Sequence, residues 1–309
     1  MAELTAPGGT SSQEVRLGRD APTTVDHLGP LADLVGTWIG TQGWELIAVP
    51  SGEPGGREGF TFIARPYVEI ITFQTTGSAP VPNRGGPAGE MSIYGLVYEV
   101  RICDLVTNEP LHLETGMFLN LSDVKGGDPP ANPIARSATI PHGDSVLALG
   151  TSFDVAGPPD ITPHTGVPDP GPEAPLGYAD AWQVKIPSPC DPSSEFNPAI
   201  PTQVLTDQLA ALQAAGTPVV KTTTLSLSTA NGGGMVNIPF VEANANATRF
   251  DCVFWIETIE VTPPNGGEPN FVQQLQYFQQ TNIEFLPQFG NSGQLIMWPH
   301  VNVNTMRKQ

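Results

Sequence analysis

Residues 97–102, which read Val-Tyr-Glu-Val-Arg-Ile, decide the fold. The charged side chains of Glu99 and Arg101 take one set of alternate positions, and Tyr98 and Val100 belong to the other set. A period of two is that of a β-strand, because successive side chains of a strand point to opposite faces of the sheet. This stretch therefore predicts a strand with two unlike faces.

Similar segments rich in β-branched and aromatic residues recur on both sides of this stretch, between clusters of Gly, Pro and Asn. They lie at 37–49, 60–64, 68–75, 91–104, 111–121, 134–140, 145–155, 178–186, 219–227, 235–242, 248–262, 270–285 and 294–298. The 309 residues include 33 Gly and 33 Pro, a content typical of a protein with many turns. Since a meandering sheet protects its edges by closing on itself, we expect an all-β fold, a single antiparallel up-and-down β-barrel of about ten strands.

The rest of the chain is expected to surround this barrel. Residues 1–22 show no apolar period and predict a disordered leader, so that one domain spans 23–309. A short helix within 24–35 is expected to plug one end of the barrel. The segment 157–217 is a predicted insertion, a proline-rich loop followed by one helix over 202–216. The insertion either packs on a flank of the barrel, which is the favoured alternative, or forms a lid over its mouth.

The charge balance excludes several partners. Thirteen basic against 31 acidic side chains give a formal net charge of −18, which repels nucleic acid and anionic membranes. The sequence shows neither a signal-peptide pattern nor an apolar stretch that would span a bilayer, which predicts a cytoplasmic protein without a membrane partner. Cys103, Cys190 and Cys252 are widely spaced and predict buried reduced thiols. The sequence leaves open whether the protein is a monomer or a homodimer.

The five histidines are the remaining candidates for chemistry, because the sequence carries no motif for nucleotide binding, zinc proteolysis or α/β-hydrolase catalysis. His300 follows the last predicted strand and is placed to point from the barrel end toward the interior. His142 lies in a Pro-His-Gly turn, where a hydrogen bond within the turn and a role in a pocket have equal weight. His112 is expected on the polar side of a strand if the flanking leucines face inward, with a surface or cross-strand partner. His27 and His164 are expected to lie outside any ligand site.

Three short segments carry a resemblance to a known family. Gly36-Thr37-Trp38-Ile39-Gly40 follows the predicted plugging helix, residues 274–278 read Gln-Leu-Gln-Tyr-Phe, and Pro299-His300 is followed by Thr305-Met306-Arg307. These segments resemble the opening strand, the penultimate strand and the closing segment of the nitrobindin family of haem-binding β-barrels. The resemblance implies a barrel like those of lipocalins and fatty-acid-binding proteins, with Trp38 closing one end.

The resemblance also implies a specific site. It makes His300 the axial ligand of a ferric haem b, groups Trp38 and Arg307 with the cofactor-binding residues, and places Arg307 or Lys308 at a haem propionate. The implied chemistry is binding of nitric oxide, isomerisation of peroxynitrite to nitrate, or reaction with another small peroxide-type substrate. If the protein is an enzyme, it is then a haem-dependent isomerase or a peroxidase-like enzyme, and His142 is the candidate distal acid–base catalyst.

Two other interpretations stay open. A barrel of this class also serves as a haem-free, lipocalin-like carrier of a fatty acid or another apolar small molecule. Alternatively, its interior is filled by its own side chains, as in small barrels, and the protein has a structural or interaction role. In all but the last interpretation, the expected partner is a small molecule.

Overall fold

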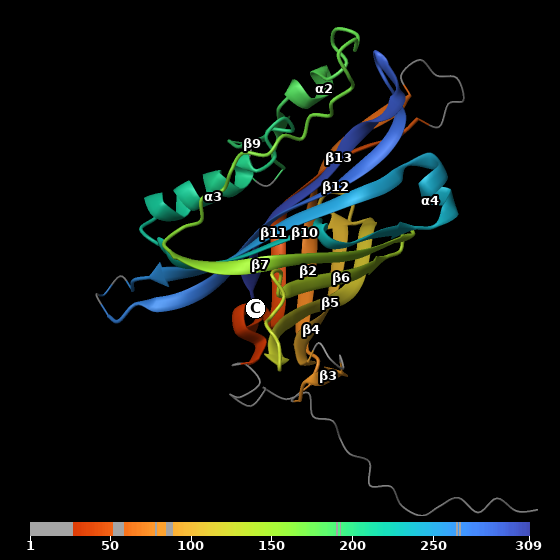
Figure 1. Ribbon diagram of the computed structural model, residues 1–309. Coiled ribbons are helices and arrows are strands. Elements are labelled where there is room, and N and C mark those ends of the chain that lie inside the picture. The colour runs from red at the N-terminus through yellow and green to blue at the C-terminus, as the bar shows by residue number, and fades with distance from the viewer. Residues whose placement is uncertain are drawn as a thin grey trace, which may run out of the picture.

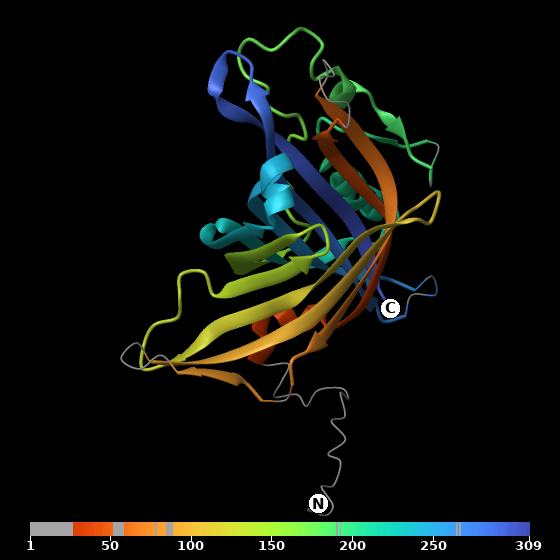
Figure 2. The same ribbon diagram turned by 90° about the vertical axis from the view of Figure 1, so that its right-hand side faces the viewer.

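The computed structural model describes residues 27–51, 59–77, 79–84, 89–189, 191, 193–263, 265 and 267–309 (Figures 1 and 2). The predicted leader 1–22 and the start of the helix predicted within 24–35 lie outside the described residues. The strands of the main sheet are β1 (Gly36–Pro50), β2 (Phe60–Thr75), β3 (Val81–Arg84), β4 (Glu90–Asp104), β5 (Pro110–Lys125), β6 (Ile134–Ile140), β7 (Asp144–Ala156), β10 (Val219–Asn237), β11 (Asn246–Val261), β12 (Asn270–Gln288) and β13 (Asn291–Lys308).

These strands form one antiparallel sheet in the order β2-β1-β13-β12-β11-β10-β7-β6-β5-β4-β3. An additional ladder between β2 and β4 closes ten of them into a barrel and leaves β3 outside. The predicted all-β barrel of about ten strands is therefore confirmed. Within the described residues, no helix combines the length and the apolar character needed to cross a bilayer.

Two pairs of predicted strands are each one continuous strand. The segments 60–64 and 68–75 join as β2 through Pro66, which lies just before the β4 ladder begins at Tyr67, so its missing N–H costs no hydrogen bond on that side. Likewise, 219–227 and the start of 235–242 are merged in β10, whose register against β7 shifts between Ser228 and Gly233. The strand prediction is wrong for the rest of 235–242, because a short helix, α4 (Pro239–Asn244), begins there. Proline and glycine clusters therefore led the sequence prediction to break strands that the ladders continue.

The prediction of a strand over 178–186 is wrong. A short helix, α2 (Asp180–Gln183), occupies this segment. Residues four apart share one side of a helical turn, and the rings of Tyr178 and Trp182 both lie against Phe60, with centroids 5.2 and 5.9 Å away. Packing of these two rings on one partner thus outweighs the strand propensity of the aromatic residues.

A short 3₁₀ helix, η1 (Gly29–Leu34), closes one end of the barrel, as the sequence predicts (Figure 2). The side chain of Leu34 is fully buried, and its carbonyl accepts a hydrogen bond of 2.7 Å from the indole nitrogen of Trp38. The Nζ atom of Lys308 reaches the carbonyl of Asp33 at 2.7 Å. The start of β1 and the end of β13, which pair with each other, are therefore both bonded to the plug.

Side chains from opposite walls meet inside the barrel. The rings of Phe118 on β5 and Phe254 on β11 are 5.5 Å apart, although three strands separate them in the sheet. The hydroxyls of Tyr67 on β2 and Tyr277 on β12 are 2.7 Å apart and fully buried. These contacts cross the lumen, so that the chain fills this layer of the barrel with its own residues.

The insertion packs on the outside of the barrel (Figure 1). It contains α2, β8 (Ile186–Pro187), β9 (Glu195–Phe196) and α3 (Gln203–Ala214). The ring of Phe196 stacks on Trp44 of β1 at 4.4 Å, and Leu205 of α3 is fully buried in the same outer hydrophobic cluster. The structure thus supports the flank rather than the lid, and the predicted helix after Thr202 is confirmed.

Trp182 tests whether the insertion is an integral part of the fold. Its side chain is 1% exposed and packs against Phe60, Phe62 and Trp298. We expect Trp182→Ala to lower the free energy of unfolding by about 3–5 kcal/mol, measured by urea denaturation. The matched control is Val184→Ala, since Val184 is 62% exposed and its truncation should cost less than about 0.5 kcal/mol. Equal effects of the two substitutions would contradict a docked insertion.

Candidate functional site

The barrel end opposite η1 gathers ionisable side chains and is called the mouth below. On β5, Asn120 donates a hydrogen bond of 3.0 Å to the carbonyl of His27 beside the plug, and on β13, Lys308 contacts the plug. His112 and His300 stand eight residues away from these contacts on the same two strands, about 26 Å at the usual rise of a strand. The residues that define the mouth are Glu45, Arg65, His112, Glu114, Arg136, His142, Asp144 and His300.

Glu45 joins an arginine to a histidine at the mouth. Its carboxylate is 2.6 Å from Nε of Arg65 and 3.3 Å from Nε2 of His300. The adjacent Trp44 and Leu46 belong to the outer hydrophobic cluster, so that Glu45 points inward. Burial opposes ionisation of Glu45, but His300 and Arg65 outweigh it and lower its pKa to about 2. The carboxylate is therefore charged and fixes one nitrogen of the His300 ring.

Glu114 also joins an arginine to a histidine, on the other side of the barrel. Its carboxylate is 2.8 Å from Nη2 of Arg136, with both side chains 3% exposed, and 3.3 Å from Nε2 of His112. The hydroxyl of Tyr98 also donates to it. Burial opposes ionisation of Glu114, but Arg136 and His112 lower its pKa to about 2. The mouth thus contains two Arg–Glu–His chains, Arg65–Glu45–His300 and Arg136–Glu114–His112.

His142 stands between these two chains. It lies in the turn between β6 and β7, and its ring centroid is 5.6 Å from that of His112. Burial, together with the nearby His112 and His300, lowers the pKa of His142. Burial raises the pKa of Asp144, the neighbouring carboxyl at the start of β7. The ring of His142 therefore lies near that of His112, and His300 is close enough to lower the pKa of His142.

A buried polar network forms the floor below the mouth. The hydroxyl of Tyr277 donates to Glu69 at 2.6 Å and is 2.7 Å from the hydroxyl of Tyr67, while Nδ2 of Asn304 donates to Glu69 at 2.8 Å. Glu69 is 2% exposed, and burial raises its pKa to about 7 against these hydrogen bonds. The floor therefore contains a carboxyl group that holds its proton near neutral pH.

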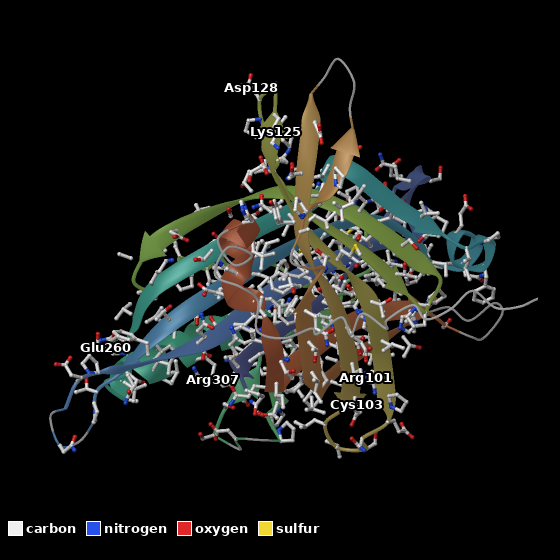
Figure 3. The ribbon with its side chains drawn as sticks, turned by 90° about the horizontal axis from the view of Figure 1, so that it is seen from below. Arg101, Cys103, Lys125, Asp128, Glu260 and Arg307 are labelled. Atoms are coloured by element: carbon white, nitrogen blue, oxygen red, sulfur yellow. The ribbon has the colours of Figure 1, made fainter. Side chains whose placement is uncertain are left out.

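The structure brings together two of the four residues that the sequence singled out. His300 and His142 lie at the mouth, close enough to influence each other electrostatically. Trp38 lies at the plugged end, and Arg307 lies beside Glu257 seven residues beyond His300, with its partner Ile39 at the start of β1. Figure 3 labels Arg307 and Cys103 well apart from each other. Cys103 directly follows Ile102, the residue of β4 that pairs with His112. A shared cofactor contact of His300, Trp38 and Arg307 stays a prediction that this arrangement does not support.

His112 is the site residue whose direction the sequence misassigned. Leu113 is 44% exposed and points outward, whereas His112 points inward with the buried Glu114. The condition that both flanking leucines face the interior is not met, since Leu111 packs against the inner cluster but Leu113 does not. An arginine inside the barrel, Arg136, makes burial of the His-x-Glu pair favourable. The inward direction was readable from Phe118 further along β5, which shares the parity of His112 and is fully buried.

The two remaining histidines lie away from the mouth, as expected. The ring of His27 stacks on Tyr94 at 4.4 Å near the plug. The ring of His164 stacks on Phe278 at 4.2 Å and lines a groove of about 440 Å³ on the outer wall. Both histidines therefore serve as controls for experiments on the mouth.

The described residues hold no group of three or more His, Cys, Asp or Glu side chains arranged to bind a metal ion. No protein-family model and no curated relative matches this chain. Among solved structures, the chain is similar to one titled "Crystal Structure of Rv2717c from M. tuberculosis", with 16% sequence identity, a TM-score of 0.41, and coverage of 94% of this chain and 99% of that chain. This level of similarity bears on neither the family nor the activity.

Glu69 makes stability depend on pH in a defined direction. Its pKa rises from 4.5 to about 7 on folding, so the folded protein holds this proton more tightly than the unfolded chain. The stabilisation is full below pH 4.5, falls as the pH rises, and is lost above about pH 7, at most about 3 kcal/mol. We expect Glu69→Gln to remove this loss, measured by urea unfolding at about pH 5 and about pH 8.

The control for this measurement is Glu99→Gln, because the Glu99 side chain is 46% exposed on the outside of β4. The free energy of unfolding of Glu99→Gln should differ from that of the unsubstituted protein by the same amount at both pH values. If Glu69→Gln also differs from the unsubstituted protein by a constant amount, Glu69 does not titrate near neutral pH in the folded protein.

Proposed function

We propose that the mouth binds haem b and that His300 is the axial ligand of the iron. The observation that carries this proposal is the position of the His300 imidazole, on the inner side of the wall, 22% exposed, with one ring nitrogen held by Glu45. The other ring nitrogen, Nδ1, takes no part in this contact with Glu45. A partly exposed imidazole at a barrel end, oriented by a carboxylate, has the chemistry of a metal ligand with its outer-shell partner.

The donors around His300 fit a haem group. Haem needs one imidazole for its iron and cationic or hydrogen-bonding groups for its propionates. Arg65, 35% exposed beside Glu45, presents the nearest guanidinium, and it replaces Arg307 in this role because Arg307 lies at the other end of β13. The contact of Glu45 with both residues fixes the imidazole and the guanidinium relative to each other.

The chain's own residues have separate roles in this proposal. Glu45 accepts a hydrogen bond from His300 and so increases the electron density on the opposite ring nitrogen. His142, in an exposed turn with a lowered pKa, is a neutral imidazole that accepts or returns a proton at the entrance. Bound haem would supply an iron centre that coordinates nitric oxide or an oxygen of peroxynitrite. Isomerisation of peroxynitrite to nitrate is the enzymatic activity that we propose to test first.

A haem-free carrier of a fatty acid is the second candidate, and the filled lumen disfavours a ligand below the mouth in both cases, while the donors at His300 favour haem. A long apolar chain would have to enter the layer where Phe118 meets Phe254 and Tyr67 meets Tyr277. It would also have to lie against the charged pair of Glu114 and Arg136, both 3% exposed. Displacing these contacts removes buried hydrogen bonds for which an alkyl chain offers no replacement.

The test is a titration of the purified protein with hemin, followed by the Soret band. We expect a saturable band for the unsubstituted protein, loss or displacement of the band for His300→Ala, and an affinity about 10-fold lower for Glu45→Gln. The matched control is His164→Ala, which removes an imidazole from the outer wall and should leave the titration unchanged.

Each outcome has a clear meaning. A Soret band that is the same in the unsubstituted protein and in His300→Ala would show that haem does not use this ligand. The carrier would be favoured if a fatty acid binds, hemin gives no distinct Soret band, and neither His300→Ala nor Glu45→Gln changes the spectrum. Stopped-flow mixing of the hemin-loaded protein with peroxynitrite then measures whether nitrate forms faster than in the His300→Ala variant.

A further inference from the structure

A groove on the outer wall at the plugged end of the barrel, called the end groove below, is separate from the mouth. It has a volume of about 820 Å³ and lies between the end of α3 and the ends of β11, β12 and β13. Figure 1 shows α3 and the joined ends of β11 and β12 on the same side of the barrel. The apolar residues that line the groove are Leu212, Ile259, Val261, Phe271 and Val272. Phe271 is 60% exposed and Val272 is 43% exposed, so that part of this apolar lining faces solvent.

Arg307 also lines the end groove, and it is an exception among the arginines of this acidic chain. The other arginine side chains that the structure describes each contact a carboxylate at 2.5 to 2.8 Å: Arg65, Arg101, Arg136 and Arg249. Within the described part of the chain, the side chain of Arg307 is exposed and forms neither an ion pair nor a hydrogen bond. The groove therefore presents a guanidinium whose donors are free for a ligand.

The carboxyl group nearest in effect to Arg307 does not neutralise it. Partial burial lowers the pKa of Arg307, and among the described side chains only Glu257 acts in the opposite direction. Burial raises the pKa of Glu257 to about 8, against a hydrogen bond of 2.5 Å from Nε2 of Gln274 and the charge of Arg307. The Oε1 atoms of Glu257 and Gln274 are both buried without a partner among the described residues, and a proton on Glu257 supplies the donor that these acceptors lack. Glu257 is therefore mainly uncharged at neutral pH.

The other charged groups at this end leave the Arg307 guanidinium unoccupied. Lys308 also lines the groove, but its Nζ atom donates to the carbonyl of Asp33, and the Asp33 carboxylate acts on its charge. Glu260 on β11 is not part of the lining, and no described residue that lines the groove is Asp or Glu. Gln309, the last residue of the sequence, lines the groove, and its terminal carboxylate forms no ion pair with a described side chain. Arg307 is thus the cation of the groove that lacks a counter-ion.

We propose that the end groove binds a small amphiphilic carboxylate, with its head group on the Arg307 guanidinium and its apolar body over Phe271 and Val272. A guanidinium donates two parallel hydrogen bonds to a carboxylate, which fits the planar head group. The apolar body removes exposed surface of both side chains from water. Since the net charge of −18 repels anions in general, the apolar contact is needed in addition to the ion pair. The inference goes beyond the proposed function, because this site uses neither the mouth nor haem.

Octanoate is the probe, because it joins one carboxylate to a short alkyl chain. Isothermal titration calorimetry of the full chain at neutral pH, without added hemin, measures its affinity. Two further probes separate the contributions of the parts: 1-octanol has the same chain without the charge, and acetate has the same head group without the chain. We expect each of them to bind at least about 10-fold more weakly than octanoate, since each retains only one of the two contacts.

Substitutions in the groove should have different effects on the two longer probes. Arg307→Gln should weaken octanoate binding about 10-fold and leave the binding of 1-octanol unchanged, because it removes only the charge-assisted hydrogen bonds. Phe271→Ser should weaken the binding of both. The matched controls are Arg101→Gln, which removes an arginine already paired with Glu99, and Phe153→Ser, which removes a ring that is 55% exposed on β7. Both controls should bind octanoate as the unsubstituted protein does.

Circular dichroism establishes that each variant is folded. Absence of octanoate binding, equal affinities for octanoate and 1-octanol, or unchanged octanoate binding by folded Arg307→Gln would each overturn the inference. If Arg307→Gln does not fold, the comparison of octanoate with 1-octanol and the Phe271→Ser variant still decide. The haem site is tested separately, since His300→Ala should bind octanoate normally. A His300-dependent Soret band without octanoate binding refutes this inference alone, and Arg307-dependent octanoate binding without a Soret band refutes the haem site alone.

Discussion

The ladder between β2 and β4 is the constraint on which the rest of the structure depends. It runs from Tyr67 opposite Asp104 to Thr75 opposite Leu96 and joins two strands that would otherwise be near opposite edges of the sheet. Once the sheet is closed, inward side chains face another wall instead of solvent, and their polar groups need partners within the lumen. The Tyr67–Tyr277 contact across the barrel is a direct result of this closure.

Closure also decides where a ligand can be admitted. Near the plug, η1 and fully buried side chains such as Trp38 and Phe73 fill the interior. Toward the mouth, the same inward positions carry Glu45 and Glu114, because an arginine beside each carboxylate offsets the cost of burying its charge. The insertion adds its hydrophobic cluster to the outer wall of β1 and β13, so that it supports the mouth from outside.

The fold was predictable from local signals, and the partners inside it were not. The alternation at 97–102 gave the correct faces of β4, and the plug was visible as a short apolar helix. The partner of the buried Glu114 is Arg136, which is 22 residues away in sequence, and no local pattern announces this pair. The identity of Glu45 as the partner of His300 depends on the register of β1 with β13, across 255 residues. Register across a closed barrel is a long-range property, and single-strand patterns do not specify it.

The two Arg–Glu–His chains explain how this end of the barrel holds charged side chains inside its wall. A buried carboxylate without a cation would take up a proton, and a buried arginine without a carboxylate would be strongly destabilising. Pairing Glu114 with Arg136 avoids both costs, and the charged Glu114 then also contacts His112. Arg65 has the same role for Glu45, which also contacts His300. Each carboxylate therefore keeps its charge inside the barrel because an arginine lies beside it, and each holds one nitrogen of a histidine ring at the mouth.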